Sequence, residues 1–116
     1  MDPPIPDDWL TDIVPIEWRP RTTHFAFAGP PDEIVLVMNF VLLKPPVRDP
    51  GISYFDRDRL RSLATGLVRG DPVPPIHVEL PDDAERFIVR HGMHRFYLSR
   101  KLGFTAIPAL LVSYGF

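Results

Sequence analysis

The sequence contains no cysteine. Disulfide bonds, catalysis by a thiolate and metal sites with cysteine ligands are therefore all excluded. The sequence also lacks the basic start and the apolar stretch that make up a secretory signal peptide. The longest apolar run, Ile34 to Leu43, includes Asn39 and falls short of the roughly 20 residues that a membrane-spanning helix needs. We therefore expect a cytoplasmic protein that neither crosses nor binds a membrane.

The composition is that of one small folded domain with an unusual amount of proline. The 116 residues are enough for a single modest core, and 15 of them are proline, well above the usual share of about 5%. This predicts many turns and irregular connections. The formal net charge of -2 indicates neither nucleic-acid nor membrane binding. The charges are unevenly placed, because residues 1–17 carry acids and no base, whereas everything after Glu85 carries bases and no acid.

Residues 1–22 are expected to form a proline-rich acidic arm, and residues 23–116 the folded domain. The arm is too apolar for a disordered acidic tail, which favours packing against the domain. Trp9 and Trp18 leave a second interpretation open, because large aromatic side chains often anchor a protein partner or a second copy of the chain.

The first part of the domain predicts an antiparallel hairpin. Residues 23–28 alternate phenylalanine with smaller side chains, residues 34–43 are almost continuously apolar, and residues 29–32 form a turn between them. The second strand is expected to be buried on both faces. Asn39 would then be a hydrogen-bonded polar group of the core.

A loop and a helix should follow. Residues 44–54 contain three prolines and one glycine, and within this loop Arg48 and Asp49 are binding candidates through their position alone. Asp56 is a good N-cap for a helix that runs to about Arg69.

The rest of the chain predicts a strand, a turn, and then a strand–turn–helix–strand unit. Alternation over residues 76–80 indicates a strand with one wet face, and residues 81–84 turn it into a second strand at residues 87–89. Helical spacing runs from His94 to Leu102, with a further apolar strand at residues 107–112.

The turn at Gly92 has the features of an anion-binding site. The first-turn N–H groups of a helix point at the space before it, and the helix dipole adds partial positive charge there. His94 and Arg95 would supply an imidazole and a guanidinium, and no acid lies between Arg86 and Lys101. The same residue types also fit an ordinary solvated basic helix, and the spacing alone does not decide between the two.

These elements resemble the second half of the ParB/sulfiredoxin-like domain, over roughly residues 55–112. The resemblance implies an α/β (α+β) fold, in which one small mixed sheet carries two main helices in a single domain. The ordered set is more specific than one short motif. It consists of Pro75, Ile76, Gly92, His94, Arg95, Leu102, Gly103, Ile107 and Pro108.

The resemblance further implies a site for the phosphates of a nucleotide, ATP or CTP. By position, the first helix would supply Arg59, Ser62 and, less closely matched, Thr65. The turn would supply the backbone amides of Gly92, Met93 and His94, and Arg95 would be the anchor.

The chain also departs from its apparent relatives. Met93 stands where sulfiredoxins have the catalytic cysteine, so sulfinic-acid reduction is excluded. ParB proteins add a helix-turn-helix region, whereas this sequence stops after the last family strand, so DNA binding is not expected. The carboxylate of the related free-serine kinase falls here on His91 or Gly92, and phosphoryl transfer would need Mg²⁺ held by acids from elsewhere.

Nucleotide hydrolysis and phosphoryl transfer therefore stay open, with no catalytic residue assigned. A metal site built from His77, Glu79, His91 and His94 is a weaker alternative, because the sequence lacks a metal-binding motif. A second class of function is an adaptor without a ligand, which would bind a partner or a second copy through the arm. A ParB-like nuclease is the third, and no acidic metal cluster supports it.

Overall fold

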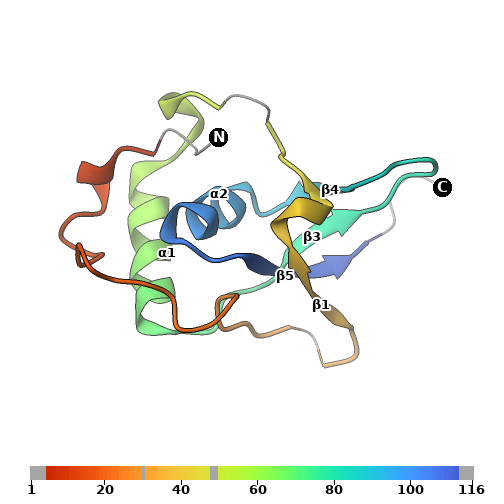
Figure 1. The fold of residues 1–116 in the computed structure, drawn as a ribbon, viewed down its shortest axis with the longest axis horizontal. Coiled ribbons are helices and arrows are strands. Elements are labelled where there is room, and N and C mark those ends of the chain that lie inside the picture. The colour runs from red at the N-terminus through yellow and green to blue at the C-terminus, as the bar shows by residue number, and fades with distance from the viewer. Residues whose placement is uncertain (1–4, 30, 48–49, 113–116) are drawn as a thin grey trace.

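The computed structural model describes residues 5–29, 31–47 and 50–112. It confirms the expected mixed α+β domain, with a five-stranded mixed sheet and two main helices (Figure 1). Short 3-10 turns occupy Asp7–Trp9, Phe40–Leu42 and Ile52–Tyr54. The main elements are β1 (Val35–Asn39), β2 (Leu43–Lys44), α1 (Arg57–Arg69), β3 (Ile76–Glu79), β4 (Phe87–His91), α2 (Met93–Leu102) and β5 (Ala106–Leu111).

The strands lie in the order β1-β5-β3-β4-β2. β1 runs antiparallel to β5, β5 is parallel to β3, β3 is antiparallel to β4, and β4 is parallel to the short β2. The β3–β4 ladder is the predicted hairpin, and it shifts register between His77 and Val78. In the described part of the chain, no helix combines the length and apolar character that crossing a bilayer requires.

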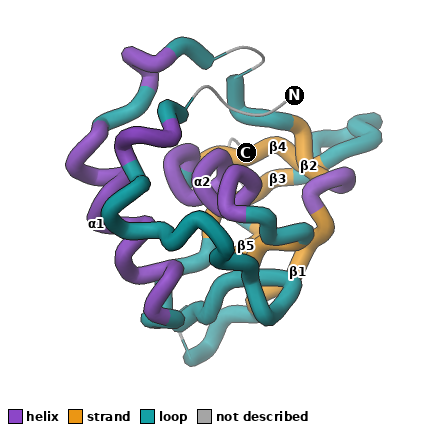
Figure 2. The backbone as a smooth tube through the Cα atoms, turned by 60° about the vertical axis from the view of Figure 1, so that its left-hand side comes forward, coloured by secondary structure: helices purple, strands orange, loops and turns teal. Residues whose placement is uncertain are grey.

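Helix α2 lies at the centre of the molecule, between the sheet and α1 (Figure 2). Phe96, Tyr97, Leu98 and Leu102 are all buried, and they point in several directions around the helix. The Ser99 hydroxyl is buried as well and donates to the carbonyl of Phe96 at 3.1 Å. A helix with buried side chains on several sides needs cover on several sides, which explains its place between the two layers.

Helix α1 forms the outer layer with the predicted boundaries. The Asp56 side chain accepts the N–H of Arg59 at 2.9 Å, and the helix ends at Gly70, whose φ of 78° is left-handed. Leu60, Ala64 and Leu67 form the buried stripe on its inner side.

The predicted hairpin between residues 23–28 and 34–43 is wrong. β1 pairs with β5 instead, and residues 23–28 contain only one isolated parallel bridge, from Phe27 to Val73. The reason is that Phe25 buries its ring edge-on to Phe104, at a centroid distance of 6.4 Å. Nearby, the Thr23 carbonyl accepts the N–H groups of residues 105 and 106. The segment is thus tied to the start of β5 rather than to β1.

The apolar run at residues 34–43 is not a strand buried on both faces. It divides into the edge strand β1, a 3-10 turn and the two-residue β2, and only Met38 and Leu43 are buried. Asn39 is exposed, and its side chain accepts the N–H of Val41 at 3.0 Å, so it caps the 3-10 turn. The expectation that Asn39 is a core polar group is therefore wrong.

The described part of the N-terminal arm, residues 5–22, contacts both helices. Ile5 and Leu10 are buried in the core. Asp12 accepts two hydrogen bonds from Arg61 of α1, at 2.7 Å each. The Trp18 ring lies edge-on to that of Phe104, with 6.1 Å between centroids.

Gly92 connects β4 to α2 through a close backbone approach. Its φ is 103°, and a Cβ placed on it would lie 2.6 Å from Cγ2 of Ile76 in β3. Any side chain here would meet both the left-handed conformational penalty and a clash with a fully buried residue. Glycine is therefore required where α2 begins over the sheet.

We predict that Gly92→Ala lowers the free energy of unfolding by about 3 kcal/mol, because backbone strain and overpacking add at this position. Gly70→Ala is the matched control. It has a φ of 78° but nothing within 4 Å of the added Cβ, so it should cost only about 1 kcal/mol. Urea denaturation measures both values. Equal losses for the two variants would contradict the steric role of Ile76.

Candidate anion-binding site

A hollow of about 710 Å³ opens at the N-terminal end of α2. It lies between that helix start, the end of β4, residues 74–75 and the first turns of α1, and we call it the α2 hollow. Its lining contains no aspartate or glutamate. The basic and imidazole side chains that line it are Arg59, His77, Arg90, His91, His94 and Arg95.

The start of α2 offers its backbone amides to this hollow. The N–H of Phe96 makes the first helical hydrogen bond, to the carbonyl of Gly92 at 2.9 Å. The N–H groups of Met93, His94 and Arg95 precede it and have no acceptor within the helix. The described residues supply none from elsewhere. The partial positive charge of the helix end is thus not neutralised by a side-chain cap.

The Arg95 side chain is fixed beside the start of α2. Its Nη1 donates to the carbonyls of Pro74 and Pro75, at 2.6 and 2.8 Å, and its Nη2 lies 3.0 Å from where a Cβ on Gly92 would be. Burial, and then the charge of Arg59, lower the pKa of Arg95. No acid of the described residues lies within ion-pair distance of its guanidinium. Nε and Nη2 are therefore left as donors on a fixed, partly desolvated cation.

Arg59 adds a second cation from α1. It is exposed, and none of the ion pairs formed by the described residues includes it. Its charge contributes to lowering the pKa of Arg95, His94 and His91 alike. Arg59 is therefore close enough to each of these three groups to repel it when that group is charged.

His94 links the two helix starts. Its Nε2 accepts the backbone N–H of Asp56 at 3.0 Å, so Nε2 carries no proton and the neutral ring has its proton on Nδ1. The ring lies edge-on to Phe55, with 5.7 Å between centroids. Burial, followed by the charge of Arg59, lowers the pKa of His94, while Asp56 acts in the opposite direction.

His91 and His77 face each other across the β3–β4 hairpin, with ring centroids 5.3 Å apart. Burial is the first cause of the lowered pKa of His91, followed by the charges of Arg95, His77 and Arg59. Arg90 also lines the hollow, but its Nε donates to Glu79 at 2.7 Å and its charge is thereby compensated.

The structure brings together five of the six residues that the sequence predicts for the site. Arg59, Gly92, Met93, His94 and Arg95 all line the α2 hollow.

Ser62, the sixth predicted residue, is exposed on α1 and does not line the hollow. The Thr65 hydroxyl donates to the Arg61 carbonyl at 2.9 Å and is thus used within its own helix. The Met93 sulfur lines the hollow and accepts a hydrogen bond from the Tyr54 hydroxyl. Arg48 and Asp49, the two loop candidates, lie outside the described residues.

Several residues of the hollow were missing from the predicted site. His77, Arg90 and His91 come from the β3–β4 hairpin, and the acceptors that fix Arg95 are carbonyls of residues 74 and 75. The alternation of residues 76–80 places His77 on the wet face, which was the available signal. The carbonyl contacts leave no signal in the sequence, because every residue has a carbonyl group.

The alternative of a metal site gains no geometric support. In the part of the chain that the structure describes, no group of three or more histidine, aspartate or glutamate side chains is placed to hold a metal ion. Glu79 is instead paired with Arg90.

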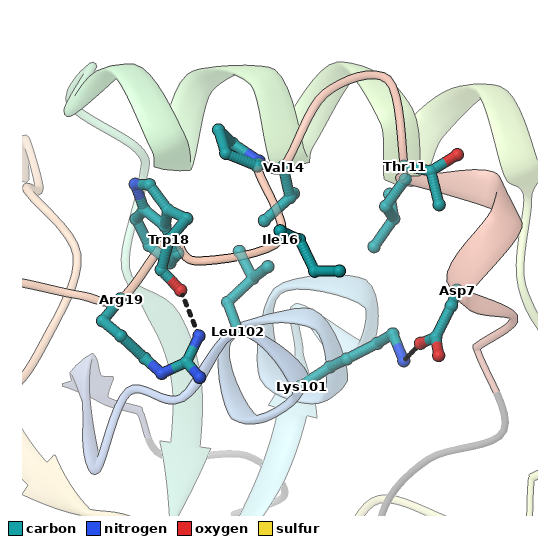
Figure 3. A pocket seen from close by; sticks show the side chains of 10 residues that line it. Asp7, Thr11, Val14, Ile16, Trp18, Arg19, Lys101 and Leu102 are labelled. Atoms are coloured by element: carbon teal, nitrogen blue, oxygen red, sulfur yellow. Dashed lines mark hydrogen bonds and ion pairs between the residues drawn. The ribbon is translucent and has the colours of Figure 1, made fainter.

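A second hollow, of about 620 Å³, lies between the N-terminal arm and the end of α2 (Figure 3). Its lining is mainly apolar, with Ile16, Trp18 and Leu102 among its residues. Lys101 at its rim donates to Asp7 at 2.6 Å, which lowers the pKa of Asp7 and compensates the lysine charge. Unlike the α2 hollow, this second hollow has an acid in its lining and a single arginine, Arg19, whose guanidinium donates to the carbonyl of Trp18.

A comparison with solved structures supports the fold. Sulfiredoxin from Arabidopsis thaliana superposes with a TM-score of 0.52 at 20% sequence identity, over 70% of this chain and 86% of that chain. No protein-family model matches the sequence. A search of curated proteins gives no match either. The chain thus has a sulfiredoxin-like fold, and at this identity the similarity extends to the fold alone.

Proposed function

We propose that this protein binds a phosphate-bearing ligand, a nucleotide such as ATP or CTP, with its phosphates at the start of α2. One observation supports this most strongly. The α2 hollow gathers two guanidinium groups without a carboxylate partner among the described residues, together with three imidazoles, and no acid lines it. Holding like charges together is unfavourable unless an anion compensates them.

The donors have the arrangement that a phosphate group needs. The amides of Met93, His94 and Arg95 supply the helix end, and Arg95 supplies Nε and Nη2 beside it. Because Nη1 is already fixed by the carbonyls of residues 74 and 75, little side-chain entropy is lost when the ligand binds. Arg59 would approach the phosphates from α1.

The rest of the hollow suits the less polar part of a nucleotide. Leu63, Val73 and Pro75 form an apolar wall beside the cationic corner. The volume of about 710 Å³ falls within the roughly 300–1,000 Å³ of small-molecule sites. A phosphate alone would leave much of this wall uncovered, which favours the larger ligand.

The proposal is one of binding and assigns no catalytic residue. The Met93 thioether has no ionisable proton and cannot act as a thiolate nucleophile. The lining offers no carboxylate ligand, so any Mg²⁺ would be held mainly by the phosphates of the nucleotide that brought it.

Arg59→Ala should weaken the binding of ATP and CTP by about tenfold, because it removes one charge-assisted contact of about 1.4 kcal/mol. This variant is preferred to Arg95→Ala, since Arg95 also bonds two carbonyls of the fold and Arg59 donates no side-chain hydrogen bond to a described residue. Isothermal titration calorimetry and the nucleotide-induced shift in Tm measure the effect.

Arg57→Ala is the matched control for this experiment. It removes the same charge from the same helix, but Arg57 does not line the hollow and its charge acts on Asp12 of the arm instead. Its nucleotide affinity should stay within about twofold of the wild type. The proposal fails if wild-type protein shows no stabilisation at millimolar nucleotide, or if both variants bind equally well.

Anion binding should strengthen as the pH falls from 8 to 6. The pKa of His91 lies below its ordinary value in the free protein, and a bound anion would raise it, so binding takes up a proton. Affinity then rises by up to about tenfold per pH unit for each proton taken up. Sulfate is the probe, because its own charge is constant in this range, and calorimetry in buffers of different ionisation enthalpy counts the protons.

His91→Gln should flatten this pH dependence. His24→Gln, which changes a histidine outside the hollow, should leave it unchanged. A wild-type affinity for sulfate that is independent of pH, or an equally steep dependence in His91→Gln, would contradict the part assigned to His91.

A further inference from the structure

Strand β1 forms one edge of the sheet and carries unpaired backbone groups. The N–H of Phe40 donates to the carbonyl of Thr105, and the β1–β5 register continues without a shift through Met38↔Ile107 and Leu36↔Ala109. Because hydrogen-bonded positions alternate in an antiparallel ladder, the even-numbered residues bond to β5. The N–H and C=O groups of Val35 and Val37 and the N–H of Asn39 therefore point away from the sheet, while the C=O of Asn39 accepts the first hydrogen bond of the 3-10 turn.

The position of Pro108 agrees with this assignment. Pro108 lies opposite Val37 and has no N–H to donate, which is tolerated where the pair is not hydrogen-bonded. Both the hydrogen bond at Phe40 and the position of Pro108 thus indicate that the backbone groups of Val37 point outward.

This edge lacks the features that usually keep sheet edges from pairing. From Ile34 to Leu43 there is no charged residue and no proline. Apolar side chains are exposed along it, namely Ile34 at 80%, Val37 at 45% and Val41 at 73%. The opposite edge differs, because β2 has only two residues and one of them is Lys44.

We propose that β1 is the interface between two copies of this chain, which pair antiparallel about a two-fold axis at Val37. Val37 of one copy would exchange both backbone bonds with Val37 of the other, and the N–H of Asn39 would donate to the C=O of Val35. The two sheets would then join into one. This interface is separate from the α2 hollow and does not depend on its ligand.

The strand suits a second copy better than an unrelated strand because it is complementary to itself. In this register the exposed Val37 side chains of the two copies meet at the axis, and the exposed Ile34 of each copy lies opposite Phe40 of the other, which is half-buried against Phe96. The acids Asp32 and Glu33 precede the strand, and an antiparallel arrangement places those of the two copies at opposite ends. Since β2 is short and charged, assembly stops at two copies.

Light scattering after size-exclusion chromatography tests this with the full chain, from micromolar to near-millimolar concentration. The wild type should reach twice the chain mass of 13.3 kDa. Val37→Pro removes an outward N–H that does not bond to β5, and Val37→Lys adds a charge at the axis, so both should be monomers. Two variants are used because proline restricts the backbone and lysine does not, and circular dichroism checks that each is folded.

Leu80→Lys is the matched control, because Leu80 is 47% exposed and lies outside β1. It should remain a dimer, as should Ile16→Lys in the arm. A wild type that is monomeric at every concentration overturns the proposal. A dimer that persists in both Val37 variants also overturns it. The same holds if Ile16→Lys produces a monomer while the Val37 variants remain dimers.

Discussion

The close approach of Gly92 to Ile76 is the contact on which the rest of this structure depends. It lets the chain leave β4, turn through a left-handed residue and begin α2 directly over the sheet. From there, α2 buries side chains toward both the sheet and α1, and the arm packs around the same helix. The same approach exposes the first amides of α2 at one end of the sheet. Core packing and the cationic corner are thus two results of one backbone geometry.

Local signals predicted the second half of the fold well. Asp56 and Gly70 delimit α1, and glycines delimit α2, because caps and left-handed residues act within a few positions of where they stand. The first half was harder to predict. Residues 34–43 have the composition of a buried strand, yet β1 is an edge of the described sheet, and its partner there, β5, comes some 70 residues later. Two neighbouring apolar segments favour the prediction of a hairpin, and the pairing of β1 with the distant β5 cannot be recognised from local sequence.

The residues of the site also divide into those that local sequence patterns indicated and those that they did not. Gly92, His94 and Arg95 follow one another along the chain, so their spacing was informative before any coordinates. The contributions of His77 and of the two proline carbonyls depend on how β3 lies beside β4 and α2, which no local pattern encodes. Arg59 was identified only through a resemblance, because an exposed arginine on an amphipathic helix looks like any other solvated side chain. The sulfiredoxin-like fold supplies the three-dimensional frame that unites these residues.

The hydrogen bond from the Asp56 N–H to His94 makes the N-terminal end of α1 sensitive to the protonation state of the His94 imidazole. A lone pair on Nε2 can serve either that amide or an incoming proton, but not both. Protonation of Nε2 would therefore break the hydrogen bond from the Asp56 N–H, while the Asp56 carboxylate, which caps α1, would attract the new positive charge. The charge of His94 and the first turn of α1, which carries Arg59, are thus coupled through Asp56.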